Sequence, residues 1–130
     1  MFTKIVNERI LELKEISEDG FDGYRIKTNK RIIEFLISNL QNCCEYWGYI
    51  STPDDVSQFI GATLKDISEI KSSSIRPDNG EDMYDGETVF LNLETSNGLL
   101  QLNVYNEHNG YYAHRIKLSI DGEIQNEDYI

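Results

Sequence analysis

Two basic residues near the carboxy-terminal end of the sequence, Arg115 and Lys117, have the clearest binding chemistry. They lie in the stretch 109–120, NGYYAHRIKLSI, where an extended conformation puts alternate side chains on opposite faces. Tyr111, Arg115 and Lys117 then share one face, and apolar residues occupy most of the other. A guanidinium offers phosphate a planar fork of donors, and an aromatic ring stacks on a base. The pattern alone is more typical of a solvated strand face, with an anion-binding site as the alternative.

Residues for catalysis or metal binding form no recognised pattern. The sequence has no glycine-rich phosphate loop and no paired-histidine helix motif. Its two cysteines, Cys43 and Cys44, are adjacent and far from His108 and His114, which is not the spacing of a zinc site. In a reducing cytosol such cysteines are expected to be free thiols that pack structurally. We therefore expect no enzymatic activity, no metal and no cofactor.

The composition is strongly acidic, with 23 Asp and Glu residues against 12 Lys and Arg residues and a formal net charge of -11. This charge repels nucleic acid and anionic membrane surfaces, so neither is an expected partner. No signal peptide and no membrane-spanning run is recognisable, which favours a cytoplasmic location. An alternative interpretation is an acidic inhibitor that mimics nucleic acid and occupies the basic groove of a host nuclease or immune effector.

Most of the chain alternates apolar and polar residues, as strands do. A hydrophobic fraction of 39% over 130 residues predicts one folded domain, 1–130. Turn residues separate the segments, and Asn97-Gly98 is a strong hairpin signal. We expect Gly48 to mark a bulge or a close approach of another group. The predicted extended segments are 9–17, 24–28, 31–38, 43–50, 62–70, 87–94, a return strand through Leu100, Leu102 and Val104, and 109–120.

A helix is predicted after residue 51. Thr52 can cap it, Pro53 suits its first position, and two aspartates favour the positive end of its dipole. A short apolar stripe then ends at Gly61, which gives about two turns. The stretch 71–86 has turn residues throughout and is predicted to be a long loop.

The last third predicts a three-stranded antiparallel meander that ends in the strand 109–120. One polar face of this meander would gather Phe90, Asn92 and Arg115. The tail 123–130 is expected either to be loose or to dock on a neighbouring subunit. The predicted fold class is therefore α+β: an antiparallel β-sheet-rich single domain with one or two short helices and a carboxy-terminal β-meander.

Three motifs resemble a known group of proteins. They are Asn42-Cys43-Cys44-Glu45, the segment 54–61 (DDVSQFIG) and Asn109-Gly110-Tyr111-Tyr112. Their order and spacing are similar to those of a family of small phage and bacterial proteins with an unassigned domain. Within it the chain resembles the phage anti-Thoeris sponges, which sequester cyclic ADP-ribose-type immune signals without cleaving them.

The resemblance implies a homo-oligomer in the cytoplasm of an infected bacterium, with a cyclic nucleotide bound at each site. Arg115 would hold the phosphates, and Arg76 in the long loop would close over the ligand. The base and sugar would contact residues drawn from Phe90, Asn92, Tyr111 and Tyr112.

Overall fold

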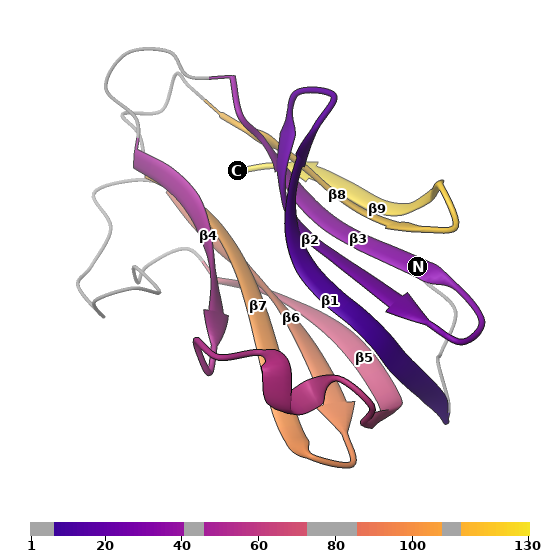
Figure 1. Ribbon diagram of the computed structural model, residues 1–130. Helices are drawn as coiled ribbons and strands as arrows, with labels where there is room; N and C mark the ends of the chain where they lie inside the picture. Colours follow the sequence, from indigo (N-terminus) through magenta and orange to yellow (C-terminus); the bar gives the residue numbers. More distant parts are fainter. Residues whose placement is uncertain (1–6, 41–45, 73–85, 108–112) are drawn as a thin grey trace.

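The computed structural model describes residues 7–40, 46–72, 86–107 and 113–130, and these form nine strands (Figure 1). The predicted strands within these ranges are confirmed, with ends that differ by a few residues. The strands are β1 (Glu8–Glu18), β2 (Phe21–Thr28), β3 (Ile32–Ser38), β4 (Tyr46–Thr52), β5 (Thr63–Ser72), β6 (Gly86–Thr95), β7 (Gly98–Glu107), β8 (Arg115–Ile120) and β9 (Glu123–Tyr129).

All neighbouring strands are antiparallel, and the sheet order is β4-β7-β6-β5-β1-β2-β3-β8-β9. The sheet folds over into two layers, one of β4, β7, β6 and β5 and the other of β1, β2, β3, β8 and β9 (Figure 1). Only two residue pairs, Glu8 with Leu64 and Arg9 with Thr63, join β1 to β5. This narrow join is therefore the fold line between the layers.

The hydrophobic core lies between the layers and is made mainly by the inward side chains of β1, β2, β3, β5, β6, β7 and β8. Tyr24 on β2 and Tyr49 on β4 meet edge to face across it, with ring centroids 5.3 Å apart. Each fully buried aliphatic or aromatic side chain contributes about 1.5–3 kcal/mol. Fully buried members of the core include Ile26, Ile33, Phe35, Ile37, Leu91, Leu93, Leu102, Val104 and Phe59.

The predicted helix after residue 51 is wrong, and of the predicted α+β class the described residues show the antiparallel, sheet-rich part. Thr52 ends β4, and the segment that follows contains a single 3-10 turn, η1 (Ser57–Phe59). The Asp55 carboxylate accepts hydrogen bonds from the Ser57 N–H and hydroxyl at 3.0 and 2.6 Å, which supports only this turn. Too few residues follow before Gly61, at φ +87°, for a helix to repay its nucleation cost. The described residues form an antiparallel, sheet-rich single domain.

The predicted carboxy-terminal meander is also wrong. The β6–β7 hairpin is confirmed, with Thr95 opposite Gly98. However, β8 pairs with β3 and β9 instead of β7. The apolar face of β8 packs in the layer of β3, where Ile116 lies opposite Ile37. Alternation showed that this strand has a buried face but could not show which neighbour covers it.

The tail after residue 122 is not loose, because it forms β9. Its last residue, Ile130, is 1% exposed. The main-chain N–H of Ile130 donates to the His114 carbonyl at 2.9 Å, and the His114 N–H donates to Ile130 O at 2.7 Å. Part of the predicted long loop belongs to strands, since β5 continues to Ser72 and β6 begins at Gly86; 73–85 lies outside the described residues.

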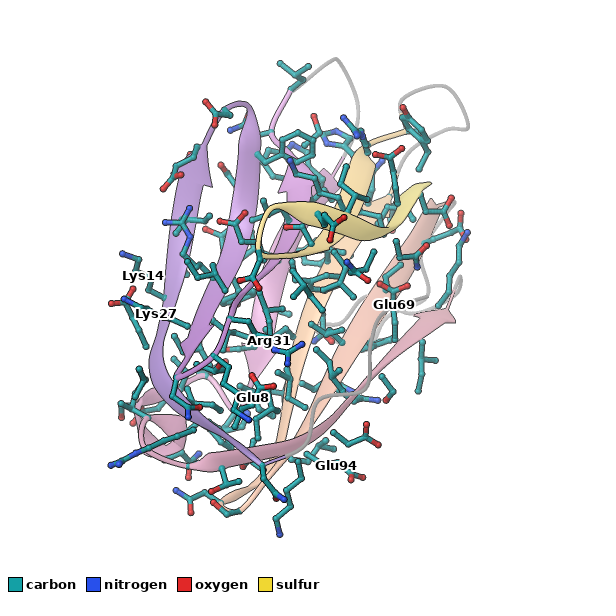
Figure 2. All side chains as sticks on the ribbon, turned by 90° about the vertical axis from the view of Figure 1, so that its right-hand side faces the viewer. Glu8, Lys14, Lys27, Arg31, Glu69 and Glu94 are labelled. Atoms are coloured by element: carbon teal, nitrogen blue, oxygen red, sulfur yellow. The ribbon has the colours of Figure 1, made fainter. Side chains whose placement is uncertain are left out.

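A buried ion pair lies where β1 crosses between the layers. The Glu8 carboxylate and the Arg31 guanidinium point toward one another (Figure 2), with Nη2 and Oε2 2.7 Å apart. Glu8 is 2% exposed and also accepts from the Thr28 hydroxyl at 2.8 Å and from Arg31 Nε at 2.9 Å. These three contacts compensate the burial of the Glu8 charge.

Polar contacts connect β9 to the opposite layer. The Lys71 ammonium on β5 lies 2.8 Å from carboxylate oxygens of both Glu87 and Asp128. The hydrogen bond from Lys71 lowers the pKa of Asp128, and burial raises the pKa of Glu69, which accepts from the Asn126 amide. The two layers are therefore linked by charges on one side and by the strand crossing on the other.

The expectation for Gly48 is confirmed as a close approach. A Cβ at this position would lie 2.6 Å from the hydroxyl oxygen and 2.9 Å from Cζ of Tyr105, its partner on β7. The tyrosine ring therefore lies over the glycine on the outer face of the sheet.

Candidate functional site

A pocket of about 330 Å³ lies on the outer face of the β1-β2-β3-β8-β9 layer. We call it the Arg115 pocket. It lies at the end of the molecule where β1 turns into β2 and β8 begins (Figure 1). Its lining includes Asp19, Phe21, Ser38, Leu40, Arg115 and Tyr129.

Strand register explains why residues so far apart in sequence meet here. Phe21 on β2 lies opposite Ser38 on β3, and Arg115 on β8 lies opposite Tyr129 on β9. Ile37 on β3 lies opposite Ile116 on β8, so the next residues in this register, Ser38 and Arg115, bring the two pairs into a single row across the sheet. Because side chains alternate along a strand, the whole row points outward, away from the core.

The Arg115 guanidinium is held by Glu127 on β9. Arg115 Nε donates to Glu127 Oε2 at 2.8 Å, and Nη2 donates to the same oxygen. This hydrogen bonding raises the pKa of Arg115, which stays charged. The side chains of Arg115 and Glu127 are 36% and 38% exposed. Water screens such a pair, so the contact is a weak restraint on the arginine.

Aromatic rings lie on both sides of Arg115. The Lys117 ammonium is 4.2 Å from the centroid of the Phe21 ring, and the Arg115 guanidinium is 5.7 Å from the same centroid. The face of Phe21 is therefore used to place two cations. Tyr129 is 60% exposed and Leu40 is 72% exposed, so both present apolar surface at the pocket. The pocket combines positive charge with an accessible aromatic ring.

His114 anchors the start of β8 beneath the pocket. Its Nδ1 lies 2.6 Å from the Ser38 carbonyl oxygen, which can only accept, so this nitrogen carries the proton. The imidazole stacks on Trp47 of the other layer, with ring centroids 5.1 Å apart. His114 is buried and faces the core, and its role is to support the backbone that carries Arg115.

Phe90 and Asn92, the other sequence-predicted site residues that the structure describes, do not line this pocket. Phe90 and Asn92 lie on β6, on the outer face of the opposite layer, and the Asn92 amide oxygen accepts from Gln101 Nε2 at 2.9 Å. The prediction that they share a face with Arg115 is wrong, because β8 does not join β7. Tyr111, Tyr112 and Arg76 lie outside the described residues.

Sequence reasoning missed Phe21 and Tyr129. Phe21 follows the Asp19-Gly20 turn, and extending the alternation back from Tyr24 would have placed it on the outer face. The tail that contains Tyr129 was expected either to be loose or to dock on a neighbouring subunit, whereas residues 123–129 form β9. The pairing of β9 with β8 is what places the Tyr129 side chain next to Arg115.

The chain belongs to a family described as a domain of unknown function, DUF7448, which it matches over residues 3–118. No curated protein and no solved structure matches it. Within the described ranges, no group of three or more His, Cys, Asp or Glu side chains is arranged to hold a metal ion. None of the helical structure in those ranges has the length and apolar character needed to cross a membrane.

Proposed function

We propose that the protein binds a small anionic ligand with a planar base, of the nucleotide class, in the Arg115 pocket and holds it without converting it. The observation that carries this proposal is the pairing of Arg115 with the exposed Tyr129 on neighbouring strands, where both line the pocket. Arginine binds phosphate through two parallel hydrogen bonds, and a tyrosine ring stacks on a base.

The size of the pocket supports a ligand of this class. Ligand pockets in proteins span about 300–1,000 Å³, and this pocket falls at the small end. Phe21 is engaged with Lys117 and Arg115, so Tyr129 is the ring that we assign to the base. Leu40 would cover the apolar edge of the ligand.

The net charge of -11 does not oppose this assignment. Salt screens charges beyond about 8 Å at physiological ionic strength. Near the pocket the two cations Arg115 and Lys117 face Glu127, while Asp19 lines it from the β1–β2 turn. A phosphate that replaces Glu127 at Arg115 is therefore bound mainly by its nearest cations.

The resemblance to anti-Thoeris sponges makes the proposal more specific. The ligand would be a cyclic nucleotide such as an isomer of cyclic ADP-ribose, sequestered by a homo-oligomer in an infected bacterial cell. The alternative is an acidic mimic of nucleic acid. Ion pairs on the described surface support this alternative less well than ligand binding, because a mimic needs unpaired carboxylates. Arg25 pairs with Glu18 and Glu34, so these carboxylates are already neutralised in part.

Calorimetric titration with AMP, ADP and isomers of cyclic ADP-ribose tests the proposal. We expect binding by the wild-type protein and about a 10- to 100-fold loss of affinity in Arg115→Met, because a charge-assisted contact is removed. Arg25→Met is the matched control, since Arg25 lies on the same outer face, pairs with carboxylates and lies outside the pocket. We expect Arg25→Met to bind as the wild type does.

The fate of the ligand separates binding from turnover. Chromatography of the bound ligand after heat release should return it unchanged. No binding by any member of the panel, with thermal unfolding showing folded protein, would refute the proposal. If the protein instead captured a basic partner in a strongly salt-dependent way, the acidic-mimic alternative would be supported. Size-exclusion chromatography with light scattering tests the implied homo-oligomer.

A further inference from the structure

We propose that Glu127 is a placeholder for the anionic group of the ligand, and that the site selects anions able to bridge Arg115 and Lys117, such as a diphosphate group. This inference rests on the proposed function and deepens it by naming the ligand class. It is carried by the arrangement of one carboxylate and two cations on neighbouring strands.

Glu127 is positioned by strand pairing next to both cations. It lies directly opposite Lys117 in the β8–β9 register, yet its carboxylate reaches diagonally to Arg115. Arg115 Nε and Nη2 both donate to Glu127 Oε2. These two donors form the edge of the guanidinium that would otherwise hold a phosphate. The carboxylate therefore occupies the position that a ligand oxygen would take.

Lys117 is the second cation of the site. It lies two residues after Arg115 on the same face of β8, so the Cα atoms of the two residues are about 6.6 Å apart. Both cationic groups lie over the ring of Phe21, so the aromatic face keeps them on the same side of the pocket. In the described part of the structure, the ammonium of Lys117 has no carboxylate within ion-pair distance.

The imbalance of charge explains the selectivity. Glu127 pairs with Arg115 and not with Lys117, so these three side chains together carry one excess positive charge. A monoanion can only exchange with Glu127 at Arg115. A diphosphate can exchange with Glu127 and also reach Lys117, and it therefore gains a second contact. Since Arg115 and Glu127 are both over one third exposed, the carboxylate can turn toward water when it is displaced.

Titrations of inorganic diphosphate and inorganic phosphate into the full chain test the inference. Glu127→Gln removes the competing charge and should bind diphosphate about 2- to 5-fold more tightly than the wild type, the range expected for an exposed ion pair. Lys117→Met should lower diphosphate affinity and bring it close to that of phosphate. Thermal unfolding confirms that each variant is folded.

Glu123→Gln is the matched control. It removes the same charge from the same strand, and the Glu123 side chain is exposed. Four residues of β9 separate Glu123 from Glu127 by about 13 Å, which exceeds the screening length of about 8 Å at physiological salt. We expect its diphosphate affinity to equal that of the wild type. An equal gain in Glu123→Gln and Glu127→Gln would mean that only net charge matters, and would overturn the placeholder role.

The outcomes separate this inference from the proposed function. Wild-type binding of nucleotides with unchanged or weaker diphosphate binding in Glu127→Gln would overturn the placeholder role and leave the proposed function standing. Equal affinity for diphosphate and phosphate in the wild type would overturn the selectivity for bridging anions. If neither the wild type nor Glu127→Gln bound any nucleotide, diphosphate or phosphate, the proposed function would fall, and the inference with it.

Discussion

Replacing Glu8 by glutamine should destabilise the fold by about 2–3 kcal/mol. Removing one partner of a fully buried ion pair costs about 3–5 kcal/mol, because the other charge stays buried without compensation. Here the cost is lower for two reasons. The Arg31 side chain is 23% exposed, so water solvates part of its charge, and glutamine keeps an oxygen that can accept from Thr28 or Arg31.

Urea denaturation followed by tryptophan fluorescence and circular dichroism measures this change. For a chain of 130 residues, such a loss lowers Tm by about 6–15 °C. Glu12→Gln is the matched control on the same strand, since Glu12 pairs with Lys14 at 3.2 Å and both side chains are about half exposed. We expect Glu12→Gln to change the free energy of unfolding by less than about 0.5 kcal/mol.

A double-mutant cycle isolates the ion pair itself. In Glu8→Gln with Arg31→Met no buried charge is left unpaired, so the double variant should lose less stability than the sum of the two single variants. We expect a coupling of at least about 1 kcal/mol. A loss in Glu8→Gln no larger than in Glu12→Gln, or strictly additive losses in the cycle, would refute the reasoning.

Two further predictions concern a glycine and a tyrosine. Gly23→Ala should lose more than about 3 kcal/mol of stability in urea denaturation, because its Cβ would lie 2.2 Å from the Phe35 carbonyl oxygen and φ is +154°. Gly20→Ala, with no atom within 4 Å of its Cβ, should lose only the cost of φ +82°, about 1 kcal/mol, and a Gly23→Ala loss of that size would contradict the steric argument. Burial, and then the hydrogen bond with Glu15, raises the pKa of Tyr49 to about 12. The unfolded chain releases this proton near pH 10, so stability should fall between about pH 10 and 12, and the fall should be smaller in Tyr49→Phe; an identical pH profile for the two proteins would count against this assignment.

The sequence predicted strands well where one face of the strand is buried and the other is exposed to solvent. Alternation through Val89, Leu91 and Leu93 identified β6, and Asn97-Gly98 identified the turn to β7. Such signals are local, because they depend on the side-chain period of a strand and on backbone torsion preferences. The partner of β8 is a long-range choice between apolar faces of similar character, and local signals do not encode it.

The same limit applies to the candidate site. Arg115 was identified from its own chemistry, and it lines the pocket. Its neighbours Phe21 and Tyr129 could not be grouped with it, because their proximity depends on the pairing of β8 with β3 and β9. The prediction of a helix after residue 51 failed for another reason. The capping residues are favourable, but the apolar stripe that follows them is too short to sustain more than one turn.

The hydrogen bond from His114 to Ser38 spans 76 positions in the sequence, and it ties together the two strands that carry the Arg115 pocket. Contacts of such high separation are slow to form, because the intervening chain must be ordered first. The pocket is therefore absent from partly folded intermediates in which β3 and β8 have not yet met. A ligand at a hundredfold excess over its Kd would favour the completed fold by about 2.7 kcal/mol. Ligand binding during refolding therefore detects the pairing of β8 with β3. At this step a newly made chain first becomes able to bind the ligand.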